Sequence, residues 1–197
     1  MRSLTLVMAG TLLLQPPAAA QFGVSAELGL GFMGGTSQDT SNADVGSLRP
    51  YRPTQLTVRP GWRFGRFTVD LGLTYATPAI AVEGSYTFVF NDTGRTMLIE
   101  AAPEVGYRLF VTGTGVSFNL HAGPVVDLWT ILGENRTVAG GQVAASVQVP
   151  LASRIQLVVR GSGVVTKSAL EKSDLPPQVE VQAMRRGTVS LGVRYGP

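Results

Sequence analysis

The sequence predicts an all-β chain that closes as an antiparallel up-and-down transmembrane β-barrel of eight strands. Hydrophobic residues recur at every second position in segments of about ten residues, the length of a tilted membrane-crossing strand. One face of each segment is aliphatic and aromatic, while the other holds charged and small residues. Tight turns alternate with long polar connections, as in barrels whose short turns are periplasmic and whose long loops are extracellular.

Residues 1–20 predict a secretory signal peptide that is cleaved before Gln21. Arg2 precedes an apolar run over residues 4–14, and small residues stand just before the expected cleavage site. The apolar run is too short to span a bilayer. The mature chain is then one barrel domain, residues 21–197.

Composition restricts the possible partners. The chain has no cysteine, so an exported protein without disulfides must be stabilised by packing or closure. It carries 16 Lys and Arg against 13 Asp and Glu, a balance that argues against a nucleic-acid surface. After the signal peptide no segment approaches about 18 consecutive apolar residues, so a spanning helix is not expected.

The first strand is expected over residues 22–33, where hydrophobic and small or polar residues alternate. A hairpin over residues 56–75 follows, turning at Gly65, which stands first in a two-residue loop as a type II′ turn prefers. Phe64 then opposes Phe67, and all large hydrophobic side chains share one face. Asp70 lies on the other face, diagonal to two arginines.

Two connections are less regular. Residues 34–53 are rich in Gly, Ser, Asn and Asp and predict a long loop. Residues 80–90 alternate again, but as an independent strand they would make nine, whereas single-chain bacterial barrels have even strand numbers. We therefore expect an extracellular extension of the third strand, with residues 77–84 looped out.

The fourth and fifth strands, residues 97–109 and 116–128, alternate in matching phase. Their expected register sets Glu104 opposite His121, the only histidine. The remaining strands are expected at residues 141–149, 155–162 and 186–195, with a second long loop at residues 166–182.

The lengths of the connections determine the expected topology, and three prolines lie within the expected strands. Tight turns at Gly65, Thr112 and Pro150 alternate with four longer connections, which places both mature termini in the periplasm. Three prolines within strands each remove a ladder donor, and we expect bulges to absorb them. These prolines are Pro60, Pro103 and Pro124.

The polar phase of the strands predicts a charged lumen. Eight strands enclose a space that side chains can fill, and buried charges persist only when they are paired. We therefore predict an ion-pair network and no open pore. The expected lumen residues are Glu27, Arg59, Arg63, Asp70, Glu100, Glu104, Arg108, His121, Asp127, Arg160, Arg186 and Arg194.

Aromatic residues recur near the expected strand ends, where a membrane-interface girdle would lie. Ligand stacking is the alternative, but recurrence at strand ends favours the girdle. The expected girdle residues are Phe32, Trp62, Phe64, Phe67, Tyr75, Phe118, Trp129 and Tyr195.

With this pattern the chain resembles the small eight-stranded outer-membrane barrels of Gram-negative bacteria, the OmpA/OmpX-like group. The most recognisable part is residues 189–195, which looks like the aromatic-ended final strand that the barrel-assembly machinery of this group recognises. The resemblance implies location in the cell outer membrane, contact with outer-membrane lipid, and assembly by that machinery.

One candidate for chemistry is the pair of His121 and Glu104, as in the outer-membrane lipid A deacylases, which the chain resembles only in size and architecture. Those enzymes need a serine beside the histidine, and Ser117 lies four residues along the strand, roughly 13 Å away. Because the pair also points into the lumen, we interpret it as structural. No catalytic residue, cofactor or metal site is assigned, since one histidine without cysteine offers no metal-ligand spacing.

The leading hypothesis is a non-enzymatic outer-membrane barrel whose extracellular loops contact an unknown partner or surface and which supports envelope integrity. The alternatives are a lipid A-modifying outer-membrane enzyme, a small-solute channel, and a soluble lipocalin-like barrel. In the soluble barrel Leu71 would face the centre and Asp70 the exterior. The positions of these two side chains therefore distinguish a soluble barrel from a membrane barrel.

Overall fold

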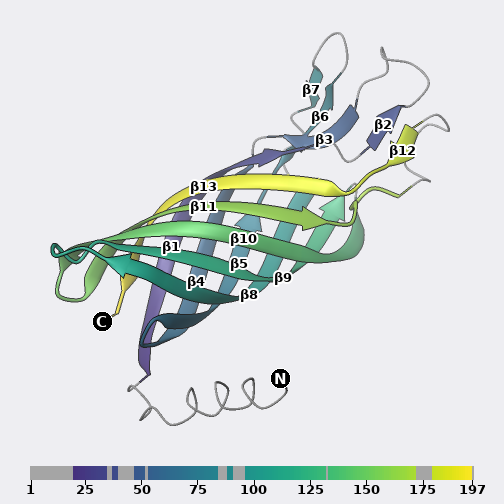
Figure 1. Cartoon of the computed structure of the whole chain (residues 1–197). Coiled ribbons are helices and arrows are strands. Elements are labelled where there is room, and N and C mark those ends of the chain that lie inside the picture. The colour runs from purple at the N-terminus through teal and green to yellow at the C-terminus, as the bar shows by residue number, and fades with distance from the viewer. Residues whose placement is uncertain are drawn as a thin grey trace, which may run out of the picture.

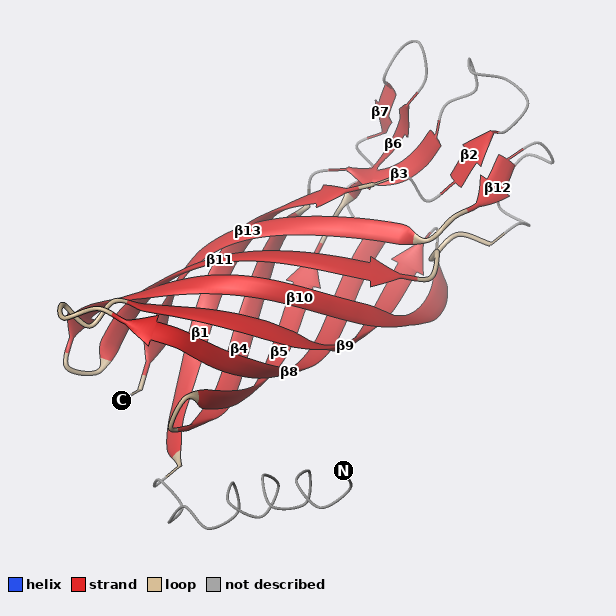
Figure 2. Ribbon diagram, viewed as in Figure 1, coloured by secondary structure: helices blue, strands red, loops and turns tan. Residues whose placement is uncertain are grey.

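Strands dominate the structure, a computed structural model (Figures 1 and 2). It describes residues 20–34, 37–39, 47–51, 53–83, 88–90, 96–131, 133–171 and 179–196. The predicted signal peptide lies outside these residues apart from Ala20. No helix that is long and apolar enough to cross a membrane occurs in these ranges.

Eight long strands form the barrel. They are β1 (Gln21–Met33), β4 (Thr54–Phe64), β5 (Phe67–Ala76), β8 (Thr96–Val111), β9 (Ser117–Ile131), β10 (Glu134–Ala152), β11 (Ile155–Thr166) and β13 (Met184–Tyr195). Each pairs antiparallel with its neighbour along the chain, and β13 pairs with β1 to close the sheet. The predicted closed eight-stranded antiparallel barrel is therefore confirmed.

Five short strands lie beyond the barrel rim, at the end opposite to the described chain ends (Figure 1). They are β2 (Ser37–Asp39), β3 (Ser47–Tyr51), β6 (Ala79–Glu83), β7 (Phe88–Phe90) and β12 (Val179–Val181). β2 pairs with β12, and β3, β6 and β7 form a separate sheet. The two long loops predicted at residues 34–53 and 166–182 thus contain paired strands.

Residues 80–90 do not form a ninth barrel strand, but the expected extension of the third strand is wrong. β6 covers part of the segment expected to loop out, and it pairs with β3 and β7 instead of a barrel strand. The alternation of Phe88 and Phe90 reflects a small separate sheet. Residues 84–87 lie outside the described residues.

Side chains alternate between the outside and the lumen along every barrel strand. Leu71 is 39% exposed and Asp70 only 3%, which is the membrane-barrel polarity. The soluble lipocalin-like alternative is therefore wrong, because it requires the reverse. The exterior is a belt of aliphatic and aromatic residues, since lipid is the solvent that such a surface suits.

Register was predicted correctly for the first hairpin and incorrectly for the pair β8 and β9. Phe64 opposes Phe67, and Gly65 has a φ of +62°, which the first position of a II′ turn requires. His121 opposes Gly106 instead of Glu104. The shift arises because the turn spans more residues than expected and a register irregularity follows between Arg108 and Phe110.

The strand prolines do not coincide with bulges. Register is unchanged across Pro60 and Pro103, and Pro124 keeps its place opposite Gly141. The irregularities lie instead beside the short turns, between Arg108 and Phe110 and between Pro150 and Ala152. The expectation that bulges absorb the prolines is therefore wrong.

The strict alternation of short and long connections is also wrong. β10 starts at Glu134 instead of Gly141, so only residues 132–133 separate it from β9. Residues 134–140 continue to pair with β9. Their outward positions include Asn135 and Thr137, because strands that extend past the hydrocarbon need no apolar outer face.

Closure can be tested with cysteines, because the natural chain contains none. Leu28 of β1 and Leu191 of β13 are direct partners on the outer face. We expect Leu28→Cys with Leu191→Cys to form a disulfide under mild oxidation of the folded barrel, measured by gel mobility without reductant. Leu28→Cys with Val159→Cys, on β11, is the matched control and should not cross-link; similar yields for both pairs would contradict the closed order.

Candidate functional site

The lumen gathers all twelve charged and histidine residues predicted for it. Ten are buried, while Arg63 and Arg108 are half-buried near the short-turn end. They come from all barrel strands except β10, which contributes polar side chains such as Ser146 and Gln148 instead. The interior is thus assembled from positions spread over most of the sequence.

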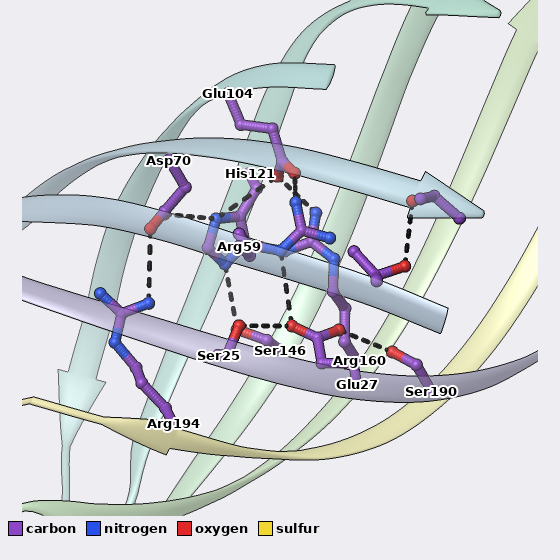
Figure 3. A network of polar contacts seen from close by, with 12 residues as sticks. Ser25, Glu27, Arg59, Asp70, Glu104, His121, Ser146, Arg160, Ser190 and Arg194 are labelled. Carbon is purple, nitrogen blue, oxygen red and sulfur yellow. Dashed lines mark hydrogen bonds and ion pairs between the residues drawn. The ribbon is translucent and has the colours of Figure 1, made fainter. Parts of the chain in front are cut away.

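Glu104 is the centre of the network (Figure 3). Its carboxylate is bonded by the guanidinium groups of Arg59 and Arg160, from strands on either side of the lumen. Arg59 also donates from Nε to Glu27 Oε1 at 3.4 Å. Ser190 Oγ donates to Glu27 Oε2 at 2.9 Å. Acids and bases therefore alternate across the lumen, which offsets the cost of burying each charge.

A second cluster lies further along the lumen around Arg186. Its Nη1 donates to Asp127 Oδ2 at 3.1 Å, and its Nη2 bonds Glu100. Thr74 Oγ1 donates to Glu100 Oε1 at 3.2 Å. One guanidinium thus serves two buried carboxylates, with a hydroxyl satisfying part of the remaining acceptor capacity.

Asp70 opposes Gly61, which places it diagonal to Arg59 and Arg63 of its own hairpin, as predicted. Asp70 also bonds an arginine of a distant strand. Arg194 Nη1 donates to Asp70 Oδ1 at 3.3 Å, across the lumen from β13 to β5. Arg63 Nη2 donates to Gln148 Oε1 at 3.1 Å. Closure thus brings side chains of non-adjacent strands within reach of one another.

His121 reaches Glu104 although the two residues are not opposite one another. Its Nδ1 lies 3.7 Å from Glu104 Oε2 and 4.0 Å from Asp70 Oδ2. Its Nε2 lies 3.0 Å from Ser146 Oγ. The sequence indicates that Ser146 is on the polar phase of its strand, but Ser117, not Ser146, was considered as the serine beside His121.

Serine, histidine and carboxylate in this order resemble the geometry that activates a nucleophile. A reaction also requires space for substrate, and both Ser146 and His121 are buried inside a filled lumen. One void among the lumen side chains has a volume of about 10 Å³ and is lined elsewhere, by residues such as Gln142 and Arg186. That is barely room for one water molecule.

An apolar layer fills the lumen at the end with the long connections. Its members project inward from the strand ends, and two of them follow β11 and fold into the barrel mouth. They are Met33, Ala76, Leu98, Trp129, Ile131, Val138, Ala169, Leu170 and Met184. This layer separates the charged clusters from the outer end of the barrel.

Trp129 is a correction to the expected girdle. It is only 1% exposed and belongs to the apolar layer, because it shares the inward phase of Asp127 on β9. The other seven expected aromatic residues are on the exterior. Aromatic pairs gather near the short turns, with ring centroids 5.3 Å apart for Phe22 and Trp62 and 5.2 Å for Phe67 and Tyr107.

No group of residues able to hold a metal ion occurs in the part of the chain that the structure describes. The charged side chains of the lumen form a packed ion-pair network and stabilise one another.

No known sequence family and no curated protein sequence matches the chain. Several solved structures are similar. Neisserial surface protein A is 15% identical, with 90% of this chain and 98% of that chain covered and a TM-score of 0.60. The outer membrane protein OprG from Pseudomonas aeruginosa is 10% identical, with 92% and 97% covered and a TM-score of 0.56.

A major outer membrane protein from Thermus thermophilus is 18% identical, with 91% and 100% covered and a TM-score of 0.55. Identities at this level establish the fold alone. Together with an apolar exterior around a charged interior, that fold defines a small eight-stranded outer-membrane β-barrel.

Replacing Glu104 tests the network. We expect Glu104→Gln to lower the free energy of unfolding by about 3–5 kcal/mol, because two buried guanidinium groups lose their shared countercharge. Urea unfolding in lipid vesicles, followed by gel mobility, measures the change. The control is Glu134→Gln, which removes an exposed partner of Arg136 and should cost less than about 1 kcal/mol. Equal losses in both variants would contradict the central role of Glu104.

Proposed function

We propose that this chain is a non-enzymatic outer-membrane barrel that forms no pore, supports envelope integrity and presents extracellular β-structure for contact with other molecules or surfaces. The observation that carries the proposal is the filling of the lumen in two layers, a charged network and an apolar layer above it. Such an interior supports a role as anchor better than a role in transport.

The extracellular end supports the surface role. β2 and β12 come from connections far apart in the sequence and pair with one another. β3 pairs with β6 in the same way. Within the described residues β2, β3, β7 and β12 each pair on one side, so each has an edge that can accept a further strand from a partner. A structured platform is therefore better suited to docking than an unpaired loop.

Assembly and lipid contact complete the proposal. The final strand β13 turns Val189, Leu191, Val193 and Tyr195 to the outside, so its outer face is apolar along the membrane-crossing part. This is the pattern expected of a strand that the barrel-assembly machinery recognises. The same face then contacts outer-membrane lipid.

Fractionation and conductance test the proposal together. We expect the protein in the outer-membrane fraction, with faster gel migration before heating than after, because a closed barrel resists detergent unfolding. In planar bilayers it should give no stepwise ionic current, since an ion-pair network and an apolar layer fill the lumen. Recovery as a detergent-free soluble monomer would overturn the membrane role, and reproducible current steps would favour the small-solute channel.

A lipid A-modifying enzyme is the second candidate, because Ser146 Oγ lies within hydrogen-bond distance of His121 Nε2. We expect no release of acyl chains from lipid A by the reconstituted barrel, measured by mass spectrometry of the lipid. Release that disappears in Ser146→Ala and in His121→Ala, with heat-modifiable migration retained, would favour the enzyme.

A further inference from the structure

The lipid-facing surface is not uniform. A shallow groove of about 620 Å³ crosses β8, β9, β10 and β11 on the outside of the barrel. Its walls include Tyr107 and Leu120, and its floor is made by small residues such as Ala122, Ala145 and Gly163. The volume falls in the range of small-molecule sites, and the exposed lining is almost entirely apolar.

Glycines in and beside the groove are not required by packing within the barrel. A Cβ added at Gly161 or Gly163 would meet no atom within 4 Å, and at Gly141 or Gly187 the nearest atom is 3.9 Å away. None of these four has a positive φ. Because glycine weakens a strand, small residues here need a reason outside the barrel.

Two cations stand at the extracellular end of the same face. On β11 the outward positions run from Gly161 through Gly163 and Val165 to Lys167, just past the strand end. Arg185 of β13 is the direct partner of Val165. Both cationic side chains are exposed, and neither forms an ion pair within the described part of the chain.

The distance from the cations to the groove matches one membrane leaflet. Lys167 lies six positions after Gly161, roughly 20 Å along the strand. Half of the hydrocarbon core is about 15 Å thick, and strand tilt shortens the projection of this span onto the membrane normal. The groove crosses β11 at Gly161 and Gly163, so it lies at a depth that an acyl chain reaches when its anionic headgroup contacts the two cations.

We propose that this groove, together with Lys167 and Arg185, binds a phosphorylated, multiply acylated glycolipid of the outer leaflet. One acyl chain lies over Ala145, Gly161 and Gly163, and a phosphate lies against the two cations. The inference rests on the proposed outer-membrane location, with the long connections extracellular. The position of the cations selects the outer leaflet, because lipids of the inner leaflet have their headgroups at the opposite end.

A second copy of the chain fits this face less well. Two barrels that share one orientation in a membrane pair about an axis along the membrane normal. Their Lys167 and Arg185 side chains would then face like charges across the interface. Two concave floors would also leave a void, whereas a flexible acyl chain fills a groove.

The test uses the full-length barrel in detergent, titrated with diphosphoryl hexa-acyl lipid A and followed by native mass spectrometry. We expect Lys167→Gln with Arg185→Gln to weaken binding about 10-fold. Gly161→Leu should fill the groove and weaken binding about as much, roughly 10-fold. Ala145→Leu is a second filling variant from another strand, and heat-modifiable migration establishes that each variant is folded.

Matched controls lie on other parts of the barrel surface. Ala26→Leu enlarges a lipid-facing residue of β1 away from the groove, and Arg66→Gln with Arg154→Gln removes two exposed charges at the short turns. These variants should bind lipid A as the natural sequence does. Dephosphorylated lipid A and phosphatidylglycerol should both bind more weakly than the diphosphoryl form.

Several outcomes would overturn the inference. They are equal binding by all variants, equal binding of the dephosphorylated lipid or of phosphatidylglycerol, and a dimer that the filling variants dissociate. In each of these outcomes the natural protein would still be found in the outer-membrane fraction. Failure of the proposed function would instead appear as loss of that location, so the two failures are distinguishable.

Discussion

Every feature of this protein depends on the need of a membrane-crossing backbone to bond its own N–H and C=O groups. The pairing of β1 with β13 satisfies that need, because it leaves no edge strand in the barrel. Closure then divides the side chains into two sets, one in lipid and one in the lumen. The apolar exterior and the charged interior are two consequences of the same closed ladder.

Eight strands also determine how the interior charges are used. The lumen is narrow enough for Arg59 and Arg160, from non-adjacent strands, to reach one carboxylate of Glu104. Such pairs mainly offset the cost of burying charge, so they add little net stability compared with the ladder. Their larger effect is on register, because a slip of one residue would move each charge into lipid.

The sequence was sufficient to predict properties that depend on which residues of a strand alternate between its two faces. It predicted the closed fold, the register of the first hairpin and the lumen side of Asp70, since these follow from alternation along the strands and from the turn at Gly65. It was insufficient where geometry depends on distant strands. The contact between Asp70 and Arg194 needs closure, and the register of His121 depends on a turn and an irregularity that no residue pattern marks. Strands β2, β3 and β12, beyond the barrel rim, were predicted as loops because outside lipid the alternation loses its physical cause.

For Trp129, residue type gave a wrong prediction where the alternation of positions along the strand gives the correct one. An aromatic residue near a strand end suggested the interface, but its phase with Asp127 places it in the lumen. The reverse holds on the outer face, where lipid requires only that side chains be apolar and fluid chains adapt to any contour. Packing inside the barrel therefore does not restrict the size of the side chains on the outer face. The outward glycines, including Gly161 and Gly163, are therefore the part of the surface that folding explains least, and recognition of a lipid gives their size a physical cause.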